Sequence, residues 1–126
     1  MPRRAACGKI KLKPAYERPD LGDRTRILVD RLWPRGIKKA DAAIDRWLRD
    51  IAPSAELRRW FAHRPERWPE FRRRYLTELL AHTELIEEIR KAARRGPVTL
   101  VYAARDEAHS DAVVLKELLT GASAES

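Results

Sequence analysis

The sequence predicts an α/β fold with a small, mostly parallel three-stranded sheet and four to five helices packed against it. The orientation of one edge strand, parallel or antiparallel, is left open. Two apolar segments, residues 26–30 and 98–103, have the β-branched composition of buried strands. The long stretch between them has helical periodicity, and a helical crossover makes neighbouring strands parallel. A chain of 126 residues is expected to form one domain, with loose ends at residues 1–7 and 121–126.

The strands differ in how they are expected to be covered. Residues 9–13 alternate lysine with apolar side chains, which indicates a strand with one solvated face. The lysines would also protect a sheet edge from pairing with another chain. Residues 26–30 are apolar at successive positions, so both faces of that strand should be covered. Residues 98–103 are the clearest strand in the sequence.

Four helical segments follow from spacing and end signals. Asp41 is a plausible N-cap of a first helix that ends at Pro53, with Ile44, Trp47, Leu48 and Ile51 on one face. Ser54 is expected to cap a short second helix. A third helical stretch should begin at Pro65, break near residues 82–83 and end at Gly96. Ser110 can cap the last helix.

Composition excludes several classes of protein. Charged residues make up 37% of the chain, and no apolar run approaches the roughly 20 residues that span a bilayer. The first residues lack the apolar core of a signal peptide. Cys7 is the single cysteine, so no internal disulfide is possible. These features predict a cytoplasmic protein that does not interact with membranes.

Positive charge is concentrated in one third of the chain. The net charge is +8, and residues 1–39 hold twelve Lys or Arg against four acids, whereas the remainder holds fifteen of each. A one-sided positive field concentrates anions such as nucleotides, phosphorylated metabolites or a nucleic-acid backbone. The alternative is that this charge serves solubility.

Charged residues follow both central strands. Because parallel strands end at the same edge, residues 30–31 should lie beside residues 105–106. Asp30 and Asp106 could then act as an acid–base pair or hold a divalent metal, and His109 could transfer a proton. Alternatively, each carboxylate pairs with a neighbouring arginine or accepts backbone amides. The histidines at 63, 82 and 109 are too scattered for a zinc site, so no metal site is predicted.

Arginines at this edge are the stronger candidates for a binding role. Guanidinium groups match phosphate or carboxylate oxygens with two hydrogen bonds, and Gly36 would let a ligand approach the backbone. Trp33 could stack on a ring, and Ser110 with the first amides of the last helix could form a second anion-binding element. The alternative interpretation of Tyr75 is that it is an aromatic side chain of the core and does not bind a ligand. The candidate ligand-binding residues are Arg31, Trp33, Arg35, Gly36, Lys38, Arg58, Tyr75, Arg105 and Ser110.

Several segments, in order along the chain, resemble the YeaO-like family, which is domain of unknown function 488. The matching stretches are residues 29–39, with the sequence Val-Asp-Arg-Leu-Trp-Pro-Arg-Gly-Ile-Lys-Lys, and residues 53–58, 60–61, 75–79, 99–106 and 112–115. The resemblance implies a small cytoplasmic prokaryotic α/β protein and no assigned reaction. The family commonly has asparagine just before the alanine that opens the last helix, where this chain has Asp111.

Two functions of different classes compete. The first is a pocket lined by arginine and aspartate that binds a small anionic, phosphate- or nucleotide-like ligand, with or without a reaction. The second is a nucleic-acid-binding module that uses the basic N-terminal third, although no helix-turn-helix, zinc finger or RNA-binding strand motif is present. A third reading is an accessory protein whose polar pocket is structural. The sequence identifies neither a cofactor nor an oligomeric state.

Overall fold

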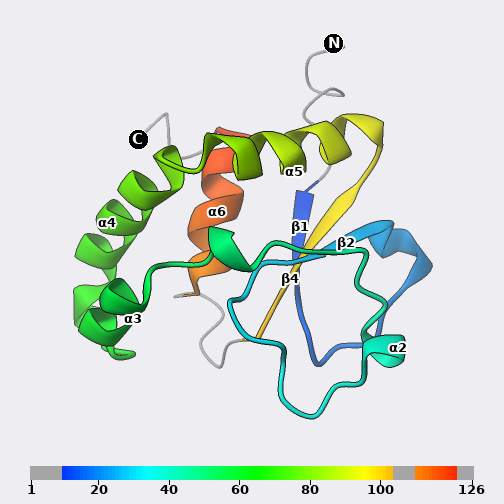
Figure 1. Cartoon of the computed structure of the whole chain (residues 1–126), viewed down its shortest axis with the longest axis horizontal. Coiled ribbons are helices and arrows are strands. Elements are labelled where there is room, and N and C mark those ends of the chain that lie inside the picture. Colours follow the sequence, from blue (N-terminus) through cyan, green and yellow to red (C-terminus); the bar gives the residue numbers. More distant parts are fainter. Residues whose placement is uncertain (1–9, 104–109, 122–126) are drawn as a thin grey trace.

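The centre of the fold is a parallel sheet of four strands (Figure 1). The structure is a computed structural model that describes residues 10–103 and 110–121. In order β1-β4-β2-β3, every pairing is parallel. The expected adjacency of the two central strands is confirmed, because β2 and β4 pair directly. The strands are β1 (Ile10–Pro14), β2 (Thr25–Leu28), β3 (Arg46–Trp47) and β4 (Val98–Tyr102).

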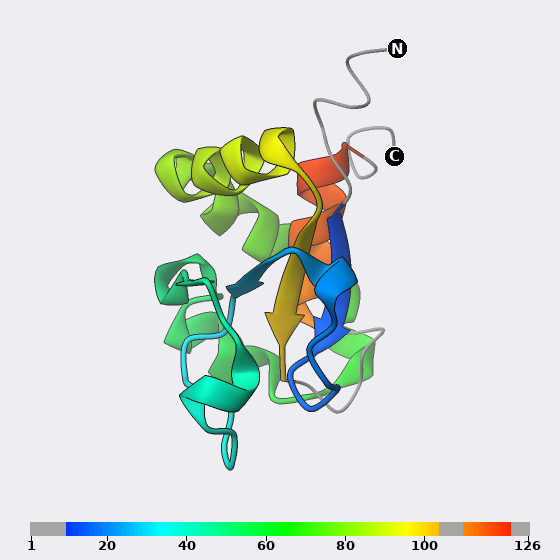
Figure 2. The same ribbon diagram turned by 90° about the vertical axis from the view of Figure 1, so that its right-hand side faces the viewer.

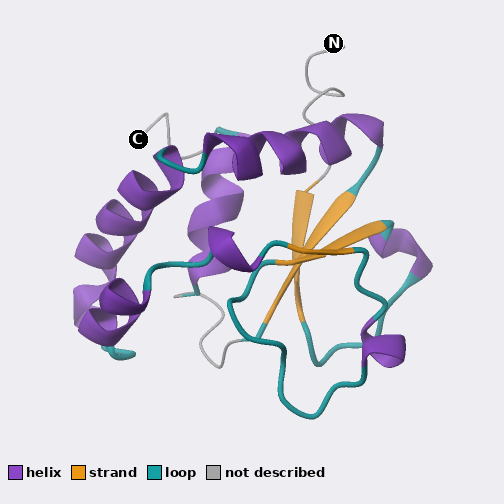
Figure 3. Ribbon diagram, in the orientation of Figure 1, coloured by secondary structure: helices purple, strands orange, loops and turns teal. Residues whose placement is uncertain are grey.

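Five α-helices lie within the described ranges (Figure 3). They are α2 (Lys39–Ala42), α3 (Ala55–Phe61), α4 (Trp68–Leu80), α5 (Thr83–Arg95) and α6 (Asp111–Thr120). Three short 3-10 helices, η1 (Leu21–Asp23), η2 (Arg49–Ile51) and η3 (Pro65–Arg67), complete the elements. None of the helices that the structure describes is long and apolar enough to cross a membrane.

The helix boundaries follow the sequence signals closely in the second half of the chain. Ser54 is the N-cap of α3, and its hydroxyl accepts a hydrogen bond from the Leu57 amide. The predicted break near residues 82–83 separates α4 from α5. Gly121, expected to belong to a loose end, is the C-cap of α6 with a φ of 81°. Residues 1–7 and 122–126 lie outside the described residues.

The sheet has four strands, not three, and no edge strand is antiparallel. The additional strand is β3, which lies where the sequence predicted a helix between Asp41 and Pro53. Of the predicted helix only α2 and the short η2 form, and α2 ends at Ala43, which has a φ of 52°. The outer edge of β2 explains this outcome, because its peptide groups need partners. β3 and the preceding turn supply those partners, which outweighs the helical spacing of the apolar side chains.

The two faces of the sheet are covered differently (Figures 1 and 2). Side chains alternate between the faces along each strand. One face carries Ile27 and Leu100 and packs against α3 to α6, which forms the main core. The other face carries Leu28 and Val101 and is covered by the segment between β2 and β3.

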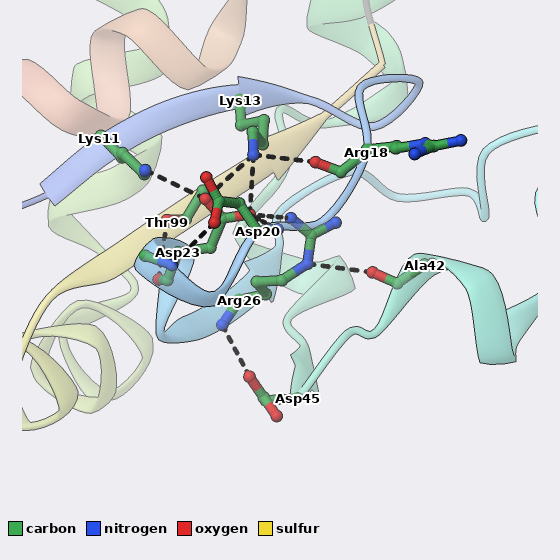
Figure 4. A network of polar contacts seen from close by, with 10 residues as sticks. Lys11, Lys13, Arg18, Asp20, Asp23, Arg26, Ala42, Asp45 and Thr99 are labelled. Atoms are coloured by element: carbon green, nitrogen blue, oxygen red, sulfur yellow. Dashed lines mark hydrogen bonds and ion pairs between the residues drawn. The ribbon is translucent and has the colours of Figure 1, made fainter.

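A buried carboxylate organises the amino end of the sheet (Figure 4). Asp23, fully buried at the end of η1, contacts the ammonium groups of Lys11 and Lys13, each at 3.0 Å, and the Arg26 guanidinium at 2.6 Å. Its backbone carbonyl accepts a hydrogen bond from Thr99 of β4 at 2.9 Å. This cluster therefore connects β1, β4, β2 and η1.

The cations outweigh the cost of burying Asp23. Burial alone would raise the pKa of the Asp23 carboxyl, but Lys13, Lys11, the Asp20 amide and Arg26 together hold it well below its usual range. Two of the three lysines in residues 9–13 therefore form ion pairs with a buried carboxylate.

Asp23→Asn should lower the free energy of unfolding by about 3 kcal/mol, because it leaves buried positive charge without a counter-charge. Urea denaturation at neutral pH measures this, with the exposed Asp41→Asn as a control that should change stability by less than about 0.5 kcal/mol. Since the pKa of Asp23 is lowered by folding, its stabilisation is present above about pH 4 and is lost as the pH falls further. Equal stability of the two variants would contradict this role.

Candidate ligand-binding site

A pocket of about 530 Å³ lies at the carboxyl edge of the sheet. Asp30 follows β2, Ala103 follows β4, and both line the pocket together with Ser110 and Asp111 at the start of α6. This volume is in the usual range for small-molecule sites. The edge that the sequence indicated therefore carries a cavity.

Asp30 is fixed by the ends of two neighbouring strands. Its Oδ2 atom accepts a hydrogen bond from the Ala103 amide at 2.8 Å, and its backbone carbonyl accepts one from the Trp47 indole at 2.7 Å. One residue thus connects the ends of β2, β4 and β3. The alternative expected for Asp30, a carboxylate that accepts a backbone amide, describes this contact.

Asp111 is the second carboxylate of the pocket. Burial, and after it the charge of Asp111, raise the pKa of Asp30 to about 7, against the Ala103 amide and the Arg58 guanidinium. Burial also raises the pKa of the Asp111 carboxyl, which Arg58 and the amides of Asp111 and Ala112 oppose. Asp30 and Asp111 are thus two carboxylates that line the pocket. Both are partly buried.

The loop after β2 forms one wall. Trp33 donates its indole N–H to the Ile37 carbonyl at 2.6 Å, and Gly36 between them has a φ of 83°, which favours glycine. The Trp33 ring packs edge-on against the Trp47 ring, with centroids 5.5 Å apart. These contacts place Arg35 at the mouth, where the Tyr16 hydroxyl donates to its carbonyl.

Helix α3 contributes positive charge to the pocket lining. Glu78 of α4 accepts hydrogen bonds from the Ser54 amide at 2.8 Å and from its hydroxyl at 2.6 Å, which anchors the start of α3. Arg58 and Arg59, one turn later, line the pocket and are exposed. We call Arg35, Arg58 and Arg59 the arginine rim.

Aromatic side chains form much of the remaining wall. Phe61 and Phe71 line the pocket, and their ring centroids lie 4.6 Å apart. Phe71 in turn contacts the Tyr75 ring at 5.9 Å. The pocket lining therefore combines aromatic side chains with charged groups of both signs.

The sequence candidates separate into three groups. Asp30, Trp33, Arg35, Arg58 and Ser110 line the pocket, whereas Arg31, Gly36, Lys38 and Tyr75 do not. Arg105, Asp106 and His109 lie outside the described residues. Their expected proximity to Asp30 therefore stays a prediction.

Two of the candidates outside the pocket wall have structural contacts. Arg31 donates to the Pro53 carbonyl at 3.3 Å, which holds the loop after β2 against the segment before α3. Tyr75 is only 1% exposed, and its hydroxyl donates to the Ile51 carbonyl at 2.6 Å. Tyr75 thus supports the pocket from within the core, which agrees with the alternative interpretation of this residue as a core side chain.

Sequence reasoning did not name some residues that line the pocket. Asp111, Arg59, Phe61, Phe71 and Tyr16 are the main ones. Asp111 had a usable signal, because it opens a helix that follows a strand at the carboxyl edge. For Arg59 and Phe61, the sequence indicated only that they lie in a helix. Periodicity does not reveal which side of a short helix faces a cavity.

The described residues offer no ready-made metal centre. No group of three or more His, Cys, Asp or Glu side chains in residues 10–103 and 110–121 is arranged to hold a metal ion. Asp30 and Asp111 alone provide fewer ligands than divalent cations usually take from a protein.

Asp30→Asn should remove part of the pH dependence of stability. The pKa of Asp30 rises from 3.8 in the unfolded chain to about 7 in the fold, so its stabilising effect is complete below about pH 4 and declines as the pH rises to 7. Above that pH, wild type should have lost about 2 kcal/mol relative to the variant, allowing for solvent screening. Chemical denaturation between pH 5 and pH 8 measures the difference, and parallel curves would refute it.

Comparison with known proteins places the chain among proteins without an assigned activity. An uncharacterized protein of Mycobacterium tuberculosis H37Rv, Rv3073c, is 45% identical over 113 residues, which cover 90% of this chain and 95% of the relative. The uncharacterized protein YeaO of Escherichia coli K12 is 42% identical over 110 residues, covering 87% and 96%. No solved structure gives a significant match.

A family model described as "Inactive DUF488-N3 subclade" matches residues 9–126, which include every described element of the fold. This match agrees with the resemblance found in the sequence motifs. The chain belongs to the DUF488 family, in the N3 subclade that is described as inactive.

Proposed function

We propose that this protein binds a small anionic, phosphate- or nucleotide-like ligand in the pocket at the carboxyl edge of the sheet, without turning it over. The observation that carries the proposal is the arginine rim. Three exposed arginines line one cavity of a size suited to a small molecule. Each of them can form two parallel hydrogen bonds to a phosphate or carboxylate group.

Two arginines of the rim are available to bind a ligand. Within the part of the chain that the structure describes, the side chains of Arg35 and Arg59 form no hydrogen bond or ion pair. Arg58 acts on Asp30 and Asp111 through space only. Binding an anion at Arg35 and Arg59 therefore breaks no hydrogen bond or ion pair of these two side chains.

The start of α6 is a poor second anion site. The amides of Asp111 and Ala112 interact with the Asp111 carboxylate itself, so they are not free for a ligand. An anionic group placed there would also face that carboxylate. The anion is accordingly assigned to the arginine rim alone, and not to the amides near Ser110.

A binding role fits Asp30 better than a catalytic one. A carboxyl group with a pKa of about 7 is suited to proton transfer. However, the subclade is described as inactive, and the other proposed catalytic residues, Asp106 and His109, lie outside the described residues. We therefore assign Asp30 to ligand recognition.

Nucleic-acid binding has less support. The basic N-terminal third includes Lys9, Lys11 and Lys13, but Lys11 and Lys13 contact the buried Asp23 carboxylate. Lys9 lies outside the described residues. Phosphate contacts from this strand would compete with an internal ion cluster.

Thermal unfolding with inorganic phosphate, pyrophosphate and nucleoside monophosphates tests the proposal. A ligand present at 100 times its Kd should stabilise the fold by about 2.7 kcal/mol, which corresponds to a rise in Tm of about 10 °C. Arg59→Gln should weaken binding about ten-fold or more, because it removes a charge-assisted contact. Arg95→Gln, an exposed arginine of α5 outside this pocket, is the matched control.

Two results would refute anion binding at this site. One is a cooperative melt that none of these anions shifts. The other is a shift that Arg95→Gln reduces as much as Arg59→Gln does, which would indicate non-specific attraction. Binding of single-stranded DNA that weakens steeply with salt, without a response to phosphate or nucleotides, would favour the nucleic-acid alternative.

A further inference from the structure

Two of the three arginines in the rim depend on one short helix for their position. Arg58 and Arg59 lie on α3, which is only seven residues long. Isolated helices of this length are not stable in water, so α3 must be held by contacts with the rest of the fold. The contacts at its first residues therefore decide where the two arginines stand.

Glu78 of α4 holds the residue that begins this helix. Its Oε1 atom accepts a hydrogen bond from the Ser54 amide at 2.8 Å, and its Oε2 atom accepts one from the Ser54 hydroxyl at 2.6 Å. Hydrogen bonds to a carboxylate are about twice as strong as those between neutral groups. Glu78 thus fixes the backbone and the side chain of the N-cap together. Glu78 itself does not line the pocket.

A continuous series of hydrogen bonds leads from Glu78 to the arginines. The Ser54 hydroxyl, which donates to Glu78, accepts a hydrogen bond from the Leu57 amide at 3.1 Å. The Ser54 carbonyl accepts one from the Arg58 amide at 3.0 Å. Since Arg59 follows on the same turn of α3, a displacement of Ser54 would move both arginines.

Tyr75 holds the same segment from the same helix. It lies one turn before Glu78, and its hydroxyl donates to the Ile51 carbonyl at 2.6 Å. Residues 75–79 and 53–58 are two of the stretches that resemble the YeaO-like family. Glu78 lies in one of these stretches and Ser54 in the other, and their contact joins the two.

We propose that Glu78 is a positioning residue of the ligand-binding site, which acts through Ser54 to hold Arg58 and Arg59 in place for an anion. This inference rests on the proposed function and adds a residue that does not touch the ligand. It predicts the opposite sign to that of a simple charge effect. Removing a negative charge near an anion site strengthens anion binding. Removing a positioning contact weakens it.

Calorimetric titration with pyrophosphate tests this sign. Glu78→Ala should weaken binding about ten-fold, because the start of α3 loses two hydrogen bonds. Glu78→Gln should stay within about three-fold of wild type, since its oxygen can accept from the Ser54 amide and its nitrogen can donate to the Ser54 hydroxyl. Glu84→Ala removes an exposed charge of α5 outside this pocket and should leave the affinity unchanged.

Two further variants separate positioning from general stability. Ser54→Ala, a milder change that keeps the fold accessible, should weaken binding about three-fold, because it removes one contact to Glu78 and the cap of α3. Asp23→Asn destabilises the fold at the amino end of the sheet and should bind pyrophosphate as wild type does.

A double-mutant cycle shows whether Glu78 acts through the arginines. The effect of Glu78→Ala should fall from about ten-fold in wild type to about three-fold or less in Arg59→Gln, because residues in one network are not additive. Equal effects in the two backgrounds would mean that Glu78 acts by another route, and would overturn the inference.

The remaining outcomes separate this inference from the proposal beneath it. If binding depends on Arg59 but is unchanged or tighter in Glu78→Ala, or unchanged in Ser54→Ala, the positioning role is wrong and anion binding stands. A loss in Asp23→Asn as large as that in Glu78→Ala also overturns the positioning role. If wild type binds neither pyrophosphate, phosphate nor nucleoside monophosphates, both proposals fail.

Discussion

The hydrogen bond between the Asp30 carboxylate and the Ala103 amide, 2.8 Å long, is the contact on which the pocket depends. Parallel strands are not joined by hairpins, so something else must hold their carboxyl ends together. Asp30 does this for β2 and β4, and its carbonyl also receives the Trp47 indole from β3. The same side chain faces the cavity. Strand alignment and the proposed ligand recognition therefore involve the same residue.

Two aspartates at opposite ends of β2 show how surroundings decide a role. Asp23, before the strand, is fully buried among three cations, which hold its pKa low and make it structural. Burial of Asp30, after the strand, and the charge of Asp111 raise its pKa to about 7, against one backbone amide and the charge of Arg58. An incompletely satisfied carboxyl group beside a cavity has capacity for a ligand. A satisfied one, closed off from solvent, contributes only to stability.

The sequence predicted the central pair of parallel strands, the Ser54 cap and the break between α4 and α5, because these follow from local chemistry. It did not predict β3, because the need of the β2 edge for hydrogen-bond partners is not visible in the local spacing of Ile44, Trp47 and Leu48. Five pocket residues were predicted because they follow strands or lie in matching motifs. Asp111 and Phe61 were missed, because only tertiary packing decides which side of a helix start or of a short helix lines a cavity.

A polar pocket in a subclade described as inactive is consistent with retained recognition after loss of chemistry. The central claim is that the cavity binds a small anion through the arginines that line it. A crystal structure with bound AMP tests this most directly. The account predicts the phosphate at Arg58 and Arg59. Phosphate bound at the start of α6, or AMP located elsewhere on the surface, would contradict it.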